Sequence, residues 1–191
     1  VVARLRAGLG LGDAPVAIYA GTLSETSHNV GLLLDAFALV HAAMPAARLL
    51  LVGTGPDGDA LRARAAALGL NGAAHFLGYV PYESVPACFG LARCSADPVA
   101  DDAVARGRSP LKIVESMAAG VPVVTGDVGD RAEMLGAHGG TIVAPGDARA
   151  LADGLLAGLR STPDMARVQA QAARFRWGQL AQTWLRAYAR P

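Results

Sequence analysis

The stretch RGRSPLKIVESMAAGVPVV, residues 106–124, combines a helix start with a cluster of positive charge. Ser109 followed by Pro110 is typical of an N-cap with proline at the first helical position, so we predict a helix that ends near Gly120. A helix N-terminus favours an anion. Three basic side chains nevertheless flank this end: Arg106, Arg108 and Lys112. A phosphate or diphosphate bound between the helix end and these cations would satisfy both.

The composition predicts one globular domain. The chain has 191 residues, of which 52% are hydrophobic and 17% charged, enough for one substantial core. Its net charge of +1 gives no global basic field, which argues against nucleic acid as a partner. No apolar run reaches the ~18 residues that suggest a transmembrane segment. Cys88 and Cys94 are too few for a disulfide framework, so we expect two buried, reduced thiols in a cytoplasmic protein.

The quoted stretch also holds the chain's single lysine. Of the 17 basic residues, 16 are arginine and only Lys112 is lysine. Lysine carries a compact point charge, so its presence beside a helix N-terminus indicates that such a charge is needed there. The alternative is an ordinary solvated surface residue.

Apolar runs alternate with helical patterns along the whole chain. About six runs are predicted as strands: Val16–Gly21, Ala47–Gly53, Ala73–Gly78, Arg93–Val99, Val121–Gly126 and Gly140–Gly146. Helical patterns follow at 30–44, 58–69, 83–92, 110–120, 147–160 and 167–190. Continuous apolar strands separated by helices are typical of a parallel sheet covered on both faces, and right-handed crossovers make it a doubly wound, Rossmann-like α/β fold.

The carboxyl ends of these strands carry the polar segments. In such sheets ligands bind beyond these ends. The segments there include GTLSETSHN (21–29), GTGPDG (53–58) and DPVADDAVARGRSP (97–110). Glycine lets backbone approach a ligand closely, although any α/β protein also needs glycine at its turns. Several such segments on one edge favour a ligand-binding face.

The segment SPLKIVESMAAGVPVV (109–124) resembles the signature of the family 4, or group 1, glycosyltransferases of the GT-B fold. The similarity continues through VAIYAGTLSETSHNVGLLLDAFALV (16–40), ARLLLVGTGPDGDALRARAAALGL (47–70) and HFLGYVPYESVPACF (75–89), and covers roughly residues 1–180. It corresponds only to the C-terminal, donor-binding half of such an enzyme. The resemblance implies that residues 1–191 form a single nucleotide-sugar-binding domain of a two-domain enzyme whose acceptor domain is absent.

The resemblance also implies roles for the matching positions. Glu115 would hold the ribose, the backbone of 78–80 would meet the nucleobase, and Lys112 would lie along the diphosphate. The residues expected to bind the donor are Gly21, Thr22, Gly78, Tyr79, Val80, Ser109, Pro110, Leu111 and Glu115. The cations expected to stabilise the leaving diphosphate, and so to act in catalysis, are Lys112, Arg108 and Arg106. For Glu115 the alternative is a solvated helix residue that pairs with Lys112 at i+3.

The resemblance further implies sugar transfer from a nucleotide-sugar, with retention of configuration and with neither a bound metal nor a cofactor. Because acceptor binding and some catalytic groups belong to the absent N-terminal domain, we expect no transferase activity from this chain alone. Its expected partners are the nucleotide-sugar and that domain. Peripheral membrane association through that domain is compatible with the sequence. The nucleobase, the sugar and the acceptor are not specified.

The sequence departs from the family pattern at several positions. Gly107 stands where the first glutamate of the family's pair is expected, and Thr22 where arginine is common. The segment SETSHN lacks the usual lysine, with His28 as the nearest candidate. Our hypothesis is that Arg106 and Arg108 restore this charge from the opposite loop. Three acidic residues could reach a donor-sugar hydroxyl or instead pair with these arginines: Asp97, Asp101 and Asp102.

Two alternative functions stay open. One is the domain of a GT-B nucleotide-sugar epimerase, and the other is a non-catalytic nucleotide-binding module that has lost the missing glutamate and basic pair. A dinucleotide-dependent dehydrogenase is disfavoured, because the G-x-G-x-x-G turn expected after the first strand is missing.

Overall fold

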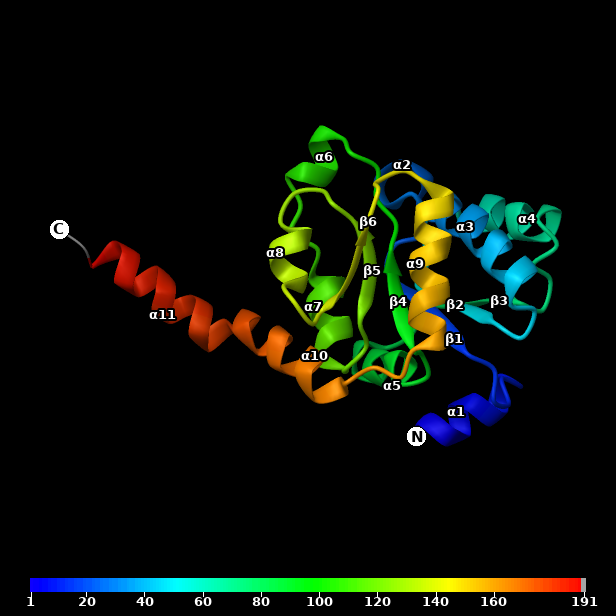
Figure 1. Ribbon diagram of the computed structural model, residues 1–191, viewed down its shortest axis with the longest axis horizontal. Helices are drawn as coiled ribbons and strands as arrows, with labels where there is room; N and C mark the ends of the chain where they lie inside the picture. The colour runs from blue at the N-terminus through cyan, green and yellow to red at the C-terminus, as the bar shows by residue number, and fades with distance from the viewer. Residues whose placement is uncertain (190–191) are drawn as a thin grey trace.

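A computed structural model describes residues 1–189, and its centre is a six-stranded parallel sheet (Figure 1). The strands are β1 (Val16–Ala20), β2 (Arg48–Val52), β3 (Ala74–Gly78), β4 (Cys94–Asp97), β5 (Val123–Gly126) and β6 (Gly140–Val143). Their order is β3-β2-β1-β4-β5-β6, and every neighbouring pair is parallel. The predicted six-stranded, Rossmann-like α/β fold is confirmed.

The topology places a switch point between β1 and β4. From β1 the sheet grows through β2 to β3, after which the chain returns to place β4 on the other side of β1. The strands β1 and β4 pair through Ala17 with Cys94 and Ile18 with Ser95. In doubly wound sheets the crevice beyond the carboxyl ends at such a point is where ligands bind.

Helices cover both faces of the sheet (Figure 1). One face packs against α3 (Val30–Ala43), α4 (Gly58–Ala67) and α9 (Ala148–Arg160). The other faces α1 (Val2–Gly8), α5 (Val85–Phe89), α7 (Leu111–Ala118), α8 (Arg131–Leu135) and α10 (Met165–Ala172). Successive strand side chains point to opposite faces, so Tyr19 joins the first layer while Ile18 joins the second. Burial on both faces explains the continuous apolar runs.

Several short helices were not predicted: α1, α2 (Glu25–His28), α6 (Ala103–Arg106) and α8. The helix predicted over 83–92 is divided into the 3₁₀ turn η1 (Tyr82–Ser84) and α5. Such elements are too short to show helical periodicity, and local capping stabilises two of them. Ser24 Oγ accepts a hydrogen bond from the Ser27 N–H at 3.2 Å, and Asp102 Oδ1 accepts one from the Ala105 N–H at 2.7 Å. These caps order the two loops that flank the switch point.

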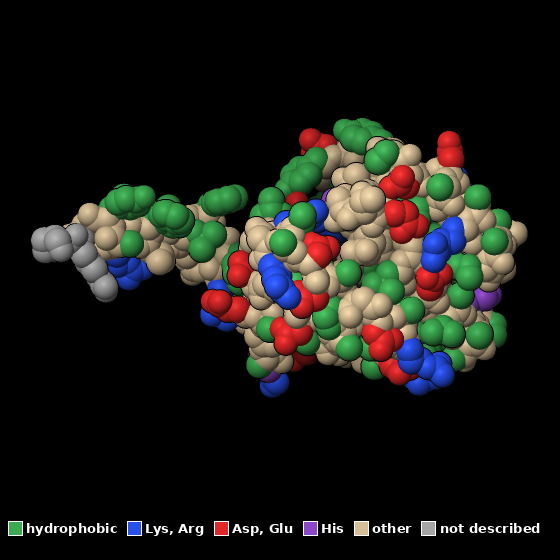
Figure 2. All heavy atoms as spheres, turned by 90° about the horizontal axis from the view of Figure 1, so that it is seen from above, with side chains coloured by type: hydrophobic (Ala, Val, Ile, Leu, Met, Phe, Trp, Pro, Cys, Tyr) green, Lys and Arg blue, Asp and Glu red, His purple; other side chains and the backbone are tan. Residues whose placement is uncertain are grey.

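The predicted helix over 167–190 is broken into two. Helix α10 ends at Ala172, a 3₁₀ turn η2 (Ala173–Phe175) follows, and α11 (Trp177–Tyr188) extends away from the body (Figure 1), while residue 190 lies outside the described part. Apolar side chains gather along this projecting segment (Figure 2) and include Trp177, Trp184, Leu185 and Tyr188. Within residues 1–189, no helix has the length and apolar character needed to cross a bilayer.

Both cysteines are buried and free, as predicted. Cys94 belongs to the core between the sheet and α9, and Cys88 to the core beneath α5. Burial raises the pKa of each thiol, so both are protonated at neutral pH. They act as small apolar core residues.

Candidate functional site

Lys112 lies at the switch point between β1 and β4. It is the second residue of α7, and its Nζ lies 3.2 Å from Asp97 Oδ1 and 4.7 Å from the centre of the Tyr19 ring. A Cβ added to Gly21 would lie 3.6 Å from this Nζ, so the ammonium sits against the turn that follows β1. Its side chain is only 16% exposed. The interpretation of Lys112 as an ordinary solvated residue is therefore wrong.

Asp97, at the end of β4, is bound through both carboxylate oxygens. Oδ1 faces Lys112, while Oδ2 accepts hydrogen bonds from Arg131 Nε at 2.8 Å and Thr125 Oγ1 at 3.1 Å. Burial raises the pKa of Asp97, but the charges of Lys112 and Arg131 outweigh this and hold it below its usual value. Asp97 is therefore ionised and fully engaged, so the expectation that it reaches a donor-sugar hydroxyl is wrong.

Arg131 completes this buried cluster from α8. Its Nη1 donates to the carbonyls of Ala105 at 3.1 Å and Val128 at 3.0 Å, and only 3% of its side chain is exposed. These contacts hold the guanidinium in one orientation behind Asp97, on the side away from Lys112.

Arg108 approaches the cluster from the opposite loop, as the sequence predicts. Its Nη1 donates to the Ser27 carbonyl, next to His28 in α2. A 2.8 Å hydrogen bond joins Nδ1 of the His28 ring to Ser27 Oγ. Burial, together with the charges of Lys112 and Arg108, lowers the pKa of His28 to about 4. His28 is therefore neutral at pH 7, and the positive charge at this edge comes from the lysine and the arginines.

Arg106 lies apart from these cations. Its Nε and Nη2 bind the two carboxylate oxygens of Asp101 at 2.6 and 2.8 Å, and 64% of its side chain is exposed. Asp102 instead caps α6. The alternative pairing proposed for these acids thus holds for Asp101, and the expectation that Arg106 supplies charge beside Lys112 is corrected. Arg106, the last residue of α6, thus pairs with Asp101, which lies just before the N-cap residue of the same helix.

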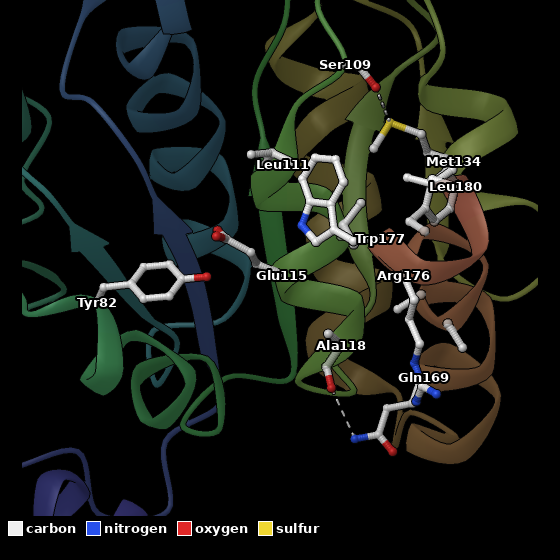
Figure 3. A pocket seen from close by; sticks show the side chains of 14 residues that line it. Tyr82, Ser109, Leu111, Glu115, Ala118, Met134, Gln169, Arg176, Trp177 and Leu180 are labelled. Atoms are coloured by element: carbon white, nitrogen blue, oxygen red, sulfur yellow. Dashed lines mark hydrogen bonds between the residues drawn. The ribbon is translucent and has the colours of Figure 1, made fainter. Parts of the chain in front are cut away.

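The N-terminus of α7 is open. The helix begins at Leu111 with Pro110 as N-cap, because Pro110 has the extended backbone of a cap residue (φ −75°, ψ 112°). Ser109 therefore does not cap the helix as predicted, and its hydroxyl faces Met134 Sδ at 3.8 Å (Figure 3). The N–H groups of Leu111 and Lys112 have no hydrogen-bond partner within residues 1–189. Two donors and a positive helix end thus remain available to an anion.

Glu115 lines a cavity of about 740 Å³ beside α7 and the segment η2–α11, and its carboxylate extends toward Tyr82 (Figure 3). Tyr82, Leu111 and Trp177 also line this cavity. The expected alternative, an i+3 pair with Lys112, does not form, because the lysine turns toward Asp97. In the described part of the chain the Glu115 carboxylate has no ion-pair partner. It can accept hydrogen bonds from a ligand.

The turn after β1 is closely packed. Gly21 donates its N–H to the Val52 carbonyl at 2.9 Å, and a Cβ added to it would lie 3.0 Å from Tyr19 Oη. Tyr19 Oη in turn donates to the carbonyl of Thr22 at 2.7 Å. Gly21 and Thr22 therefore form a fixed backbone surface directly beside the Lys112 ammonium.

The segment predicted to meet a nucleobase, 78–80, begins at the last residue of β3. The Gly78 carbonyl accepts a 2.8 Å hydrogen bond from the Gly53 N–H, so it is already used. The main-chain groups of Tyr79 and Val80 make no backbone hydrogen bond within residues 1–189, and Tyr79 is exposed. The peptide groups of Tyr79 and Val80 are therefore the ones that remain available to contact a nucleobase.

Three residues of the site were missed: Tyr19, Thr125 and Arg131. Tyr19 lies in β1 and Thr125 in β5, while Arg131 is the first residue of α8. An arginine is rarely buried unless it is paired, and a polar residue within a continuous apolar strand needs a hydrogen-bond partner. Of the three, only Arg131 could have been recognised from the sequence as a site residue, because it follows the glycine-rich turn after the predicted fifth strand.

We expect the substitution His28→Gln to flatten the pH dependence of stability below neutrality. The native pKa of about 4 lies below the ordinary value of 6.5, so the unfolded chain binds a proton that the native state does not. His28 therefore destabilises the fold increasingly as pH falls from about 6.5 to 4. Melting temperatures of both proteins between pH 4.5 and 7.5 should show a smaller decrease for the variant. Parallel curves would contradict this.

Comparison with curated proteins gives the following relatives. Residues 14–161 match the family described as "Glycosyl transferases group 1". The chain is 33% identical over 176 residues to phosphatidyl-myo-inositol mannosyltransferase of Mycobacterium leprae, covering 90% of the chain and 45% of that protein. It is 33% identical over 144 residues to GDP-mannose-dependent alpha-(1-6)-phosphatidylinositol monomannoside mannosyltransferase of Mycolicibacterium smegmatis, covering 74% and 37%. The chain thus spans less than half the length of these two relatives.

Solved structures share the fold. The Anabaena protein HepE in complex with UDP and glucose superposes with a TM-score of 0.78 at 26% identity, covering 96% of this chain and 51% of HepE. Sucrose-phosphate synthase from Thermosynechococcus elongatus gives a TM-score of 0.68 at 26% identity, covering 97% and 49%. In both comparisons this chain corresponds to about half of a longer protein.

Proposed function

The chain belongs to the group 1 glycosyltransferases, and on this premise we propose that it is the donor-binding domain of a retaining glycosyltransferase. Its ligand would be a nucleoside-diphosphate sugar bound at the carboxyl edge of the sheet. The fold supports the proposal, because the site lies at the switch point where doubly wound sheets bind nucleotides.

The observation that carries the proposal is the excess of positive charge around an open helix end. Asp97 offers one negative charge to Lys112 and Arg131, and Arg108 adds a further cation, which leaves two positive charges uncompensated. The free N–H groups of Leu111 and Lys112 lie at the same place. A diphosphate carries the charge and the acceptor oxygens that such a site requires.

The same groups would act on the reaction. When the bond between the sugar and the diphosphate breaks, negative charge grows on the departing diphosphate oxygen. Preorganised cations and N–H donors beside that oxygen stabilise the transition state more than the ground state. In this proposal Lys112 and Arg108, together with the first turn of α7, supply that stabilisation.

Glu115 would distinguish a nucleotide from a simple phosphate. Its carboxylate lies one turn into α7 beyond the open N–H groups and faces the cavity, where ribose hydroxyls could donate to it. The peptide groups of Tyr79 and Val80 offer hydrogen bonds to a base. HepE is described in complex with UDP, and one mannosyltransferase relative is described as GDP-mannose-dependent. UDP and GDP are therefore the two candidate nucleotides.

The acceptor and some catalytic groups would come from a second domain. The curated relatives are more than twice as long as the part that this chain matches. Helix α11, whose residues Trp177 and Leu180 line the cavity, presents Trp184 and Tyr188 to solvent, which suits contact with another folded unit. We infer that transfer requires that unit.

The substitution Glu115→Ala tests the nucleotide assignment. We expect it to weaken binding of UDP or GDP, whichever the parent binds more tightly, by about 10- to 100-fold, the usual effect of losing hydrogen bonds to a charged group. Binding of inorganic pyrophosphate should stay within about twofold of the parent, because pyrophosphate has no ribose. Isothermal titration calorimetry at fixed salt measures all three ligands.

Asp153→Ala is the matched control, because Asp153 is an exposed acid on α9 in the opposite layer. It should leave every affinity unchanged. Equal losses for nucleotide and pyrophosphate in the Glu115 variant would contradict the ribose role. A parent chain that binds neither nucleotide would overturn the donor-binding proposal.

A further inference from the structure

Asp97 lies between two cations, only one of which borders the ligand site. We propose that Asp97 is a positioning residue that fixes the Lys112 ammonium against the β1 turn, and that Arg131 neutralises Asp97 so that the charge of Lys112 remains available to an anion. This inference rests on the proposed function of the site. It assigns Asp97 and Arg131 a role that requires no contact with the ligand.

The two carboxylate oxygens of Asp97 have different partners. Oδ2 is held by Arg131 at 2.8 Å and by Thr125 at 3.1 Å, while Oδ1 points to Lys112 at 3.2 Å. Arg131 is itself fixed by two backbone carbonyls. The carboxylate therefore cannot rotate without breaking buried hydrogen bonds, and Oδ1 offers a fixed anchor for the ammonium.

A lysine at this position needs such an anchor. Its charge sits on a flexible four-carbon stem with considerable rotamer freedom. The Tyr19 ring, 4.7 Å from Nζ, supplies a second wall, and Tyr19 is held by its hydrogen bond to the Thr22 carbonyl. With Asp97 and the ring in place, the ammonium is ordered before any ligand arrives, so binding loses less entropy.

Arg131 decides the net charge. A lone Asp97 would cancel Lys112 and remove its attraction for a diphosphate. Because Arg131 pairs with the same carboxylate, the three groups together keep one positive charge, and Lys112 is the member on the ligand side. The titratable and charged groups facing Lys112 are Tyr19 of β1, His28 of α2, Asp97 of β4, Arg108 of the loop before α7 and Arg131 of α8.

The single lysine of the chain makes this inference directly measurable. Protein carrying ¹³C- and ¹⁵N-labelled lysine should give one side-chain signal, and the parent protein should show an ordered ammonium that exchanges its protons slowly. Burial lowers the pKa of Lys112, and Asp97 opposes this effect. In the variant Asp97→Asn the lysine stays buried but loses its anchor, so its pKa should fall further and its ammonium should exchange protons faster than in the parent.

Binding of UDP or GDP gives the second measurement. We expect Asp97→Asn to weaken binding about tenfold at pH 7, as the ordering of a long side chain becomes part of the binding cost. The loss should grow toward pH 9, because the buried lysine deprotonates more readily without the Asp97 carboxylate. Asp101→Asn is the matched control, since Asp101 is an exposed acid paired with Arg106, and it should change neither measurement.

The outcomes separate this inference from the proposed function. A parent that binds no nucleoside diphosphate overturns the proposed function. A parent that binds, with Asp97→Asn binding equally or more tightly at both pH values, overturns the positioning role alone. A freely mobile Lys112 side chain in the parent also overturns it, even if the variant fails to fold.

Discussion

Replacing Lys112 with methionine is expected to weaken the binding of UDP or GDP by about 10- to 100-fold. The change keeps an unbranched side chain but removes the cation in the first turn of α7 that lies against the β1 turn. Hydrogen bonds to charged groups contribute about 1.5–3 kcal/mol, which corresponds to this range. Calorimetric titration at low and high salt measures it, and the parent should lose more affinity with salt than the variant.

Arg106→Met provides the control for this experiment. It removes one positive charge only six positions away in the sequence, but that charge is exposed and paired with Asp101. The control should bind within about twofold of the parent, because exposed charges are screened by salt. The same affinity in both variants would show that net charge rather than position governs binding. The Lys112 variant should fold, since Asp97 keeps Arg131.

The strands could be predicted from the sequence because both faces of the sheet are buried. The runs VAIYA and RLLLV have no polar face, and that pattern alone excludes a surface strand. The break between α10 and α11 could not be predicted, because 173–175 contains no proline or glycine. The turn depends on tertiary packing of Phe175, which lies against the core under α7.

The candidate site was predicted in part. Lys112 stood out because it is the only lysine beside a predicted helix start, and the structure places it at the switch point. The positions of Arg106 and Arg108 could not be distinguished from the sequence. Both lie in a segment between a predicted strand and a predicted helix, where no periodicity indicates the direction of a side chain. The structure sends one to Asp101 and the other to Ser27.

The pairing of Asp97 with Arg131 shows where sequence reasoning ends. The two residues are 34 positions apart, on β4 and α8, and they meet only because β5 lies beside β4. From the sequence, Asp97 could be expected only to reach a donor-sugar hydroxyl or to pair with Arg106 or Arg108. Once the partner is known, the same acid becomes part of the support for Lys112.

Replacing Arg131 with methionine is expected to lower the free energy of unfolding by about 3–5 kcal/mol, the usual cost of removing one partner from a buried ion pair. Asp97 would keep Lys112 and the Thr125 hydroxyl, and the carbonyls of Ala105 and Val128 would lose the guanidinium donor. Urea unfolding followed by circular dichroism measures the loss. Arg167→Met is the matched control, because its ion pair with Asp164 is exposed, and its effect should be below about 1 kcal/mol.

The effect of Arg131→Met should also depend on pH. The native pKa of Asp97 lies below its value of 3.8 in the unfolded chain, so the pair stabilises the protein above about pH 4 and this contribution is lost as pH falls through the native pKa. Without Arg131 the burial of Asp97 is opposed by Lys112 alone, and the native pKa rises. The difference in stability between the two proteins should therefore shrink from pH 7 to pH 3. An equal difference at both pH values would mean that Arg131 stabilises the fold by packing and by its carbonyl contacts, and not through the charge of Asp97.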